Sequence, residues 1–278
     1  MRNNVVLLFS KVPEVGLVKT RLSILKDGIF PPEEACELYR CMLLDVVDII
    51  CSALDDLEGA GAGDADRYEL VVSTTPPANV EVMRKLLAEA DTTRPITVIA
   101  DEGASFDEHY NHAFAQCWER GADCVLSMGA DMPALTKADV KFGFEQLHRL
   151  CAIEGGGIVL APDQEMGVSV IGWTRNTVFD HTGVFYNADG LTVLPAYIAK
   201  AREAGLPALW LPPIPDIDTM ADFFHNVTLV NALAYCAAFD DVQPARRTAE
   251  KFADLGFREI HVAPNNLFDP RESIDKQA

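Results

Sequence analysis

The chain has 278 residues, of which 49% are hydrophobic and 23% are charged, and its formal net charge at pH 7 is −19. This composition is that of a soluble globular protein with enough residues for a substantial core. The acidic charge excludes a general nucleic-acid-binding protein, because most of the surface would repel a phosphate backbone. No apolar run approaches the roughly 18 residues of a membrane helix. We therefore expect a cytoplasmic protein with no membrane insertion.

Seven cysteines are present, which is an odd number, and none of them forms a Cys-x-x-Cys pair. A disulfide framework and a structural zinc site are therefore both excluded. Most of the cysteines lie within apolar periodic segments, so we expect buried, reduced thiols.

The first element is an apolar strand that begins at Asn4 and ends at Ser10, and a basic loop follows it. The loop residues of interest are Ser10, Lys11, Gly16, Lys19, Thr20 and Arg21. Glycine permits close approach of the backbone, and three cations can contact several phosphate oxygens at once, so the loop is typical of a polyphosphate site. The spacing of Gly16 from Lys19 fits neither a Walker loop nor the three-glycine dinucleotide fingerprint. An ordinary solvated turn is the alternative.

Beyond this loop, helix and strand patterns alternate along the chain. Strands are expected over 69–74, 96–100, 124–128, 157–161, 168–173 and 208–211, and helices over 31–54, 79–90, 105–120, 136–151 and 190–204. The acidic, glycine-rich stretch 55–66 predicts a surface loop. Apolar strands that alternate with helices predict a three-layer α/β/α fold with a mostly parallel, Rossmann-like sheet.

Ligands of such a sheet bind beyond the carboxyl ends of the strands, where three further motifs lie. They are Gly129-Ala-Asp131-Met-Pro133, Ala161-Pro-Asp163-Gln-Glu-Met-Gly167 and Pro215-Asp216-Ile-Asp218-Thr219. We expect Asp216 and Asp218 to point in opposite directions, so that only one of them would face the site. The alternatives are that Asp131 and Asp218 or Thr219 cap helices and that 161–167 is a plain turn.

Two carboxylates beside a basic loop can bind a metal ion together with substrate phosphates. Mg²⁺, or Mn²⁺ in its place, prefers one or two carboxylates together with water and substrate phosphates, so Asp131 and Asp218 are the expected metal ligands. They are expected to follow neighbouring strands and to lie close enough to share one ion. Lys11, Lys19 and Arg21 would neutralise the remaining phosphate oxygens, and with Asp131 they form the predicted catalytic set.

The motifs at 9–22, 129–135 and 216–219, with Asp222 after the last, resemble those of the nucleotide-diphospho-sugar transferase superfamily, which has the GT-A-like fold. Within it the chain is similar to the DUF2064 group of proposed glycosyltransferases and to the 2-phospho-lactate guanylyltransferases. The resemblance covers about residues 4–225. It implies that the basic loop grips nucleotide phosphates, with Asp163 and Gly167 beside the nucleotide, and that Asp131 and Asp218 hold the metal. Residues 161–163 are more similar to the guanylyltransferase branch, since the glycosyltransferase-like counterpart usually has Asp-Gly-Gly-Tyr.

Three functions remain open at this point. The first is nucleotidyl transfer from a nucleoside triphosphate to a small phosphorylated acceptor, which the three cations favour. The second is sugar transfer from a nucleotide-diphospho-sugar, and the third is nucleotide binding without catalysis. The nucleobase and the acceptor are not specified by these residues.

The C-terminal stretch 226–278 follows a predicted transferase domain, 1–225. Helices are expected over 222–239 and 244–255, with a short strand over 259–263 and a polar tail after Pro264. The apolar face of the first helix must be covered. We expect this extension to dock on the main domain, with a homodimer interface as the alternative.

Overall fold

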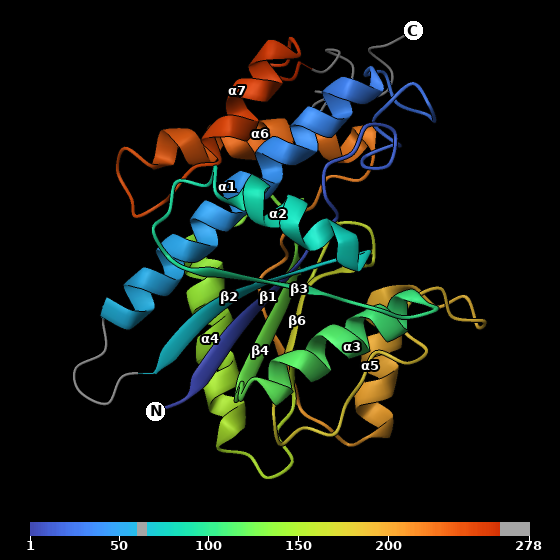
Figure 1. Ribbon diagram of the computed structural model, residues 1–278, viewed down its shortest axis with the longest axis vertical. Helices are drawn as coiled ribbons and strands as arrows, with labels where there is room; N and C mark the ends of the chain where they lie inside the picture. The colour runs from blue at the N-terminus through green and yellow to red at the C-terminus, as the bar shows by residue number, and fades with distance from the viewer. Residues whose placement is uncertain (60–65, 262–278) are drawn as a thin grey trace, which may run out of the picture.

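A single seven-stranded sheet forms the centre of the computed structural model, which describes residues 1–59 and 66–261 (Figure 1). The strand order is β3-β2-β1-β4-β6-β5-β7. The strands are β1 (Asn3–Phe9), β2 (Arg67–Thr74), β3 (Ile96–Ala100), β4 (Cys124–Gly129), β5 (Ile158–Pro162), β6 (Val168–Thr174) and β7 (Ala208–Trp210). Only β6 runs antiparallel to its neighbours β4 and β5. The predicted mostly parallel sheet is confirmed.

Helices cover both faces of the sheet, which confirms the three-layer architecture (Figure 1). They are α1 (Pro32–Gly59), α2 (Val80–Leu87), α3 (Phe106–Glu119), α4 (Lys137–Cys151), α5 (Val193–Glu203), α6 (Met220–Cys236) and α7 (Arg246–Asp254), with a 3₁₀ turn at Pro77–Asn79. Alternation along β1 explains the two layers. Val6 and Leu8 pack in the core that contains α1 and α4, whereas Val5 and Leu7 pack in the core that contains α3 and α5.

Helix α1 is longer than predicted, because it continues to Gly59 through the first part of the expected acidic loop. Its last turns are held by ion pairs, since Arg94 lies 2.7 Å from both Asp55 and Glu58. Glu58 also accepts a hydrogen bond from the backbone N–H of Tyr68. The prediction of a loop was therefore wrong for 55–59, where acidic side chains have partners on a distant segment. Residues 60–65 lie outside the described part of the chain.

Helix α7 lies against α1 and also contacts α6 (Figure 1). The backbone N–H of Thr248 donates to Asp45 at 2.7 Å, and the guanidinium of Arg247 contacts Asp45 and Asp48. Phe252 is buried against Phe223 of α6. Because α6 extends from residue 220 to 236, the proposed division after residue 225 falls inside a helix.

The strand expected over 259–263 is not formed in its described part. Residues 259–261 have no strand structure, and Glu259 and His261 are exposed. Residues 262 and 263 and the predicted polar tail lie outside the described residues.

All seven cysteines are free, but they are not uniformly buried. Cys236 is exposed on the last turn of α6, which corrects the expectation for that residue. The Sγ atoms of Cys124 and Cys151 lie 3.4 Å apart, unbonded, where β4 begins and α4 ends.

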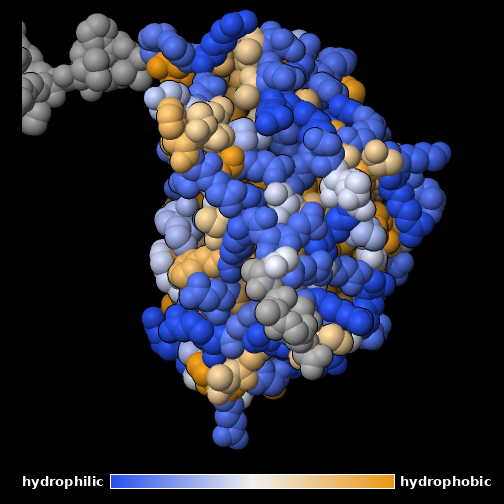
Figure 2. Space-filling view, turned by 90° about the vertical axis from the view of Figure 1, so that its left-hand side faces the viewer, coloured by the Kyte–Doolittle hydropathy of each residue, from blue (hydrophilic) through white to orange (hydrophobic). Residues whose placement is uncertain are grey.

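Apolar side chains are scattered over the face of the molecule in Figure 2, which is mostly hydrophilic. Within residues 1–59 and 66–261, no helix has both the length and the apolar character needed to cross a membrane.

Candidate active site

Three segments that are far apart in the sequence meet at the carboxyl edge of the sheet. Lys19 comes from the loop after β1, Asp131 follows β4, and Asp218 lies in the segment that leaves β7. The ammonium Nζ of Lys19 donates to Asp131 Oδ2 at 2.6 Å and to Asp218 Oδ1 at 2.8 Å. The two carboxylates are therefore as close together as the sequence predicted.

The route by which they meet differs from the prediction, because β4 and β7 are not neighbours and β6 and β5 lie between them. Residues 211–219 instead run across the strand ends. Backbone N–H groups along this segment donate first to β5, from Leu211 to Leu160 and from Ile214 to Pro162, and then from Ile217 to Asp131 after β4, at 2.9 to 3.1 Å. This crossing segment brings Asp218 to the end of β4.

Neither carboxylate is a helix cap, so that alternative is wrong for both. Thr136 caps α4 and Thr219 caps α6, each in a reciprocal capping box with an aspartate three residues later. The carboxylate of Asp222, which completes the second box, also accepts a hydrogen bond from the backbone N–H of Asp218. Asp131 and Asp218 are thus held in place by their neighbours while their own oxygens face Lys19.

Burial and charge act in opposite directions on Lys19, whose side chain is only 6% exposed. Burial alone would lower its pKa, but the charges and hydrogen bonds of Asp131 and Asp218 outweigh burial and raise the pKa. The Lys19 charge in turn lowers the pKa of Asp218. The Tyr39 ring of α1 lies 5.9 Å from the ammonium and forms part of its surroundings.

Asp216 belongs to this cluster as well, although the alternation argument excluded one of the two aspartates. Side chains two residues apart lie on the same face of an extended segment, so the expectation that Asp216 and Asp218 point in opposite directions was wrong. Gln164 fixes the position of Asp216 by donating to its carboxylate at 3.1 Å and accepting from its backbone N–H at 3.2 Å. Burial, followed by the charges of Asp131 and Asp218, raises the pKa of Asp216 to about 8.

This pKa gives a prediction for the unliganded protein. Because the folded-state pKa of Asp216 lies above the ordinary value of 3.8, folding retains a proton that the unfolded chain releases, and stability falls as pH rises between about 4 and 8. Asp216→Asn cannot ionise. We expect its melting temperature to exceed that of the wild type at pH 8 and the difference to shrink at pH 5. A difference that is independent of pH would contradict this assignment.

The other residues of the basic loop point outward or support its base. Lys11 and Arg21 are exposed, and Arg21 lies 4.0 Å from Asp218. Ser10 is buried, and its hydroxyl lies 2.9 Å from both Lys11 O and the Tyr39 hydroxyl. Gly16 has a φ of +78°, which explains the glycine.

Thr20 is half-buried, and its carbonyl accepts from Ser23. Replacing Lys19 should destabilise the unliganded protein, because its removal leaves two carboxylates without their cation.

Asp163 and Gly167 form the turn between β5 and β6. The Asp163 carboxylate accepts the backbone N–H groups of Glu165 at 2.6 Å and Gly167 at 2.7 Å. A Cβ atom at Gly167 would lie 1.9 Å from Asp163 Oδ2, so the turn itself requires glycine there. The turn interpretation therefore accounts for both residues without a ligand. Asp163 still lies close enough to Asp216 for its charge to raise the pKa of Asp216.

A second polar group at the same edge was missed from the sequence. Asp101, directly after β3, is buried and accepts hydrogen bonds from Ser73 Oγ at 2.7 Å and from His109 Nδ1 at 2.6 Å. No spacing in the sequence connects these three residues. They meet because β2 and β3 are neighbours in the sheet and α3 begins shortly after β3.

The donor set at the acidic cluster suits Mg²⁺ or Mn²⁺. Asp131 and Asp218 already hold a cation, the Lys19 ammonium, between two hard oxygen atoms. The described residues include no group of three or more His, Cys, Asp or Glu side chains that is arranged to hold a metal. Two carboxylates supply only part of a Mg²⁺ coordination shell, and substrate phosphates and water would supply the rest.

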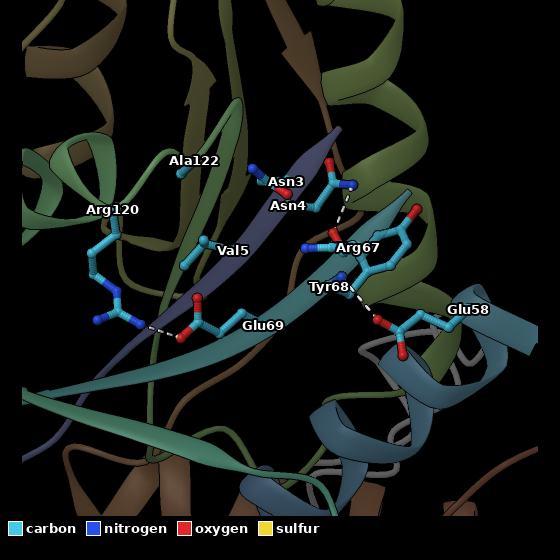
Figure 3. A pocket seen from close by; sticks show the side chains of 9 residues that line it. All are labelled: Asn3, Asn4, Val5, Glu58, Arg67, Tyr68, Glu69, Arg120 and Ala122. Atoms are coloured by element: carbon cyan, nitrogen blue, oxygen red, sulfur yellow. Dashed lines mark hydrogen bonds and ion pairs between the residues drawn. The ribbon is translucent and has the colours of Figure 1, made fainter. Parts of the chain in front are cut away.

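A separate hollow lies at the opposite, amino-terminal edge of the sheet, where Asn3, Tyr68 and Arg120 line a cavity of about 490 Å³ (Figure 3). Arg120 pairs with Glu69 there, and Glu58 accepts from the backbone N–H of Tyr68 and pairs with Arg94, which lies outside the cavity. This hollow lacks the converging carboxylates and cations of the carboxyl edge.

Comparison with known families finds the similarity to the DUF2064 group that the motif around Asp131 indicates. The model of the family described as "uncharacterized protein conserved in bacteria (DUF2064)" matches residues 60–188. This range is less than half of the chain. It includes the motif around Asp131 but neither the basic loop nor the crossing segment. No curated protein matches the chain.

Among solved structures, one from Desulfovibrio desulfuricans G20, provisionally assigned as a nucleotide-diphospho-sugar transferase, superimposes with a TM-score of 0.68. It is 24% identical, and the match covers 94% of this chain and 100% of the other. A cytidylyltransferase from Leptospira borgpetersenii serovar Hardjo-bovis is 10% identical over 95% of this chain and 100% of the other, with a TM-score of 0.49. The first similarity confirms the predicted nucleotide-diphospho-sugar transferase fold, and the second is too weak to carry an argument.

Proposed function

We propose that the protein is a nucleotidyltransferase, which uses a divalent metal to transfer a nucleotidyl group from a nucleoside triphosphate to a small phosphorylated acceptor. The observation that carries the proposal is the meeting of Asp131, Asp218 and Lys19, with the exposed cation Arg21 4.0 Å from Asp218 and Lys11 in the same loop. A negatively charged protein has little reason to gather cations at one strand end unless the ligand there is an anion.

The reaction needs few groups from the protein. An oxygen of the acceptor phosphate attacks the α-phosphorus, the bond from that phosphorus to the bridging oxygen of the β-phosphate breaks, and pyrophosphate leaves. The acceptor phosphate is already an anion at neutral pH, so no general base is required. When bound by Asp131 and Asp218, a divalent ion would offset the charge of the phosphate oxygens.

The side chains of the basic loop would supply the remaining stabilisation. Lys11 and Arg21 would contact the β- and γ-phosphates, whose charge grows as pyrophosphate departs. Positioning by these fixed donors accounts for the rate in such reactions, and no covalent intermediate is needed.

Sugar transfer is the second candidate, because two carboxylates and a metal suit a diphosphate sugar equally well. The assignment of the D. desulfuricans structure also favours it. Pyrophosphate release separates the two reactions, since only nucleotidyl transfer produces it.

The test incubates the protein with Mg²⁺, each of the four nucleoside triphosphates and a panel of small phosphorylated acceptors. The expected result is acceptor-dependent release of pyrophosphate with one preferred nucleobase. Parallel reactions contain nucleotide sugars. Release of a nucleoside diphosphate there, with no pyrophosphate from any triphosphate, would refute nucleotidyl transfer in favour of sugar transfer.

A further inference from the structure

Lys19 occupies the position that a metal ion between Asp131 and Asp218 would need. Its nitrogen lies 2.6 and 2.8 Å from one oxygen of each carboxylate, and its side chain is almost fully buried. A Mg²⁺ ion bound by the same oxygens at about 2.1 Å would fall in the volume that the ammonium fills. The ammonium and the ion therefore cannot share these two oxygens.

The side chain of Lys19 can change position without the rest of its loop. Val18 and Leu22 on either side are buried in the core, so the backbone is anchored there, whereas Leu17 and Arg21 are exposed. Lys19 has a φ of +45°, a backbone conformation that side-chain-bearing residues seldom adopt, and residues 10–19 form no helix or strand. The movement therefore falls to the long, unbranched lysine side chain.

We propose that Lys19 is an internal competitor for the divalent ion. In the unliganded protein its ammonium neutralises Asp131 and Asp218, and it leaves them when the metal arrives with a nucleotide, whose phosphate oxygens become its new partners. The proposal rests on the proposed function, because it takes the ion and the nucleotide from that reaction.

Two consequences follow from a shared site. The ion alone binds weakly, since it must first displace a buried ammonium that has no other partner. A polyphosphate then strengthens metal binding by receiving the ammonium, and by linkage the metal strengthens nucleotide binding by the same factor. Metal and nucleotide thus enter together, and the acidic cluster is never left without a cation.

The test measures Mn²⁺ affinity in the absence of nucleotide, by titration calorimetry or by the electron paramagnetic resonance signal of the free ion. Lys19→Met retains an unbranched apolar stem and removes the charge. We expect it to bind Mn²⁺ about tenfold more tightly than the wild type, or better. Lys11→Met, which removes a cation from the same loop that touches neither carboxylate, should remain within about twofold of the wild type.

If Lys19 only held the cluster together, Lys19→Met would bind Mn²⁺ more weakly than the wild type. The proposed competition is overturned if Lys19→Met binds Mn²⁺ no more tightly than the wild type. It is also overturned if neither protein binds Mn²⁺.

A measurement on the wild type decides the question if Lys19→Met does not fold. The reactivity of each lysine toward an amine-specific reagent is followed by mass spectrometry, with and without saturating Mn²⁺. Lys19 should be protected without metal and should become reactive with it, whereas Lys11 should react equally in both states. Continued protection of Lys19 in the Mn²⁺-bound protein would overturn the proposal.

These outcomes are separable from those of the transfer assay. Metal-induced exposure of Lys19 in a protein that releases no pyrophosphate would refute nucleotidyl transfer alone. Pyrophosphate release with no change at Lys19 would refute the competition alone.

Discussion

Asp131→Asn is expected to lower the rate of pyrophosphate release about 100-fold or more, in line with the loss of one of few charged metal ligands. The carboxamide is nearly isosteric and can still accept a hydrogen bond from Lys19, so the fold should be retained. What it lacks is the negative charge that a hard divalent ion requires. The measurement is the metal-dependent turnover at saturating nucleotide, with the melting temperature recorded as a check on folding.

Glu165→Gln is the matched control, because Glu165 is an exposed acid at the same sheet edge that lies outside the cluster. It should retain the wild-type rate. If Asp131→Asn kept more than a third of that rate with an unchanged dependence on Mg²⁺, the cluster around Lys19 would not be the metal site.

Phe252→Ala is expected to reduce the free energy of unfolding by about 3–5 kcal/mol, the usual loss for a fully buried phenylalanine. The Phe252 ring is 1% exposed and packs edge-on against Phe223, with ring centroids 5.1 Å apart. Urea denaturation gives the change from the midpoint at constant m-value.

The control for this variant lies on the same part of the chain. Phe239 is 77% exposed, so Phe239→Ala should change stability by no more than about 0.5 kcal/mol. Equal effects of the two substitutions would show that α7 is not docked as described.

Truncation after Asp240 removes α7 altogether, so that Asp45 loses its contacts with the Thr248 amide and the Arg247 guanidinium. The truncated chain should lose solubility, which light scattering would detect.

Most of the fold was predictable because its signals are local. Apolar runs of strand length and helical periodicity identify β1 to β7 and α1 to α7, and Thr136 marks the start of α4 as expected. The errors occur where contacts with residues far along the chain determine the local structure. The last turns of α1 form because Arg94, far along the chain, pairs with Asp55 and Glu58.

The sequence indicated which residues of the candidate site come together better than it indicated how they are arranged. Position after a strand was enough to select Asp131 and Asp218, since carboxyl ends gather at one edge of a parallel sheet. The contacts of Lys19 with both carboxylates and the place of Asp216 in the same cluster depend on the path of residues 211–219, which no local pattern encodes. The same holds for Asp101, whose partners Ser73 and His109 come from other elements.

The crossing segment also sets a limit on how this site can vary. Between Leu211, which is anchored on β5, and Ile217, which is anchored on Asp131, the chain has a fixed number of residues to span two strand ends. One residue more or fewer changes the available contour length by about 3.5 Å, which exceeds the 2.8 Å contact between Lys19 and Asp218. The length of this segment therefore determines whether the Asp218 carboxylate reaches Lys19 in the loop after β1.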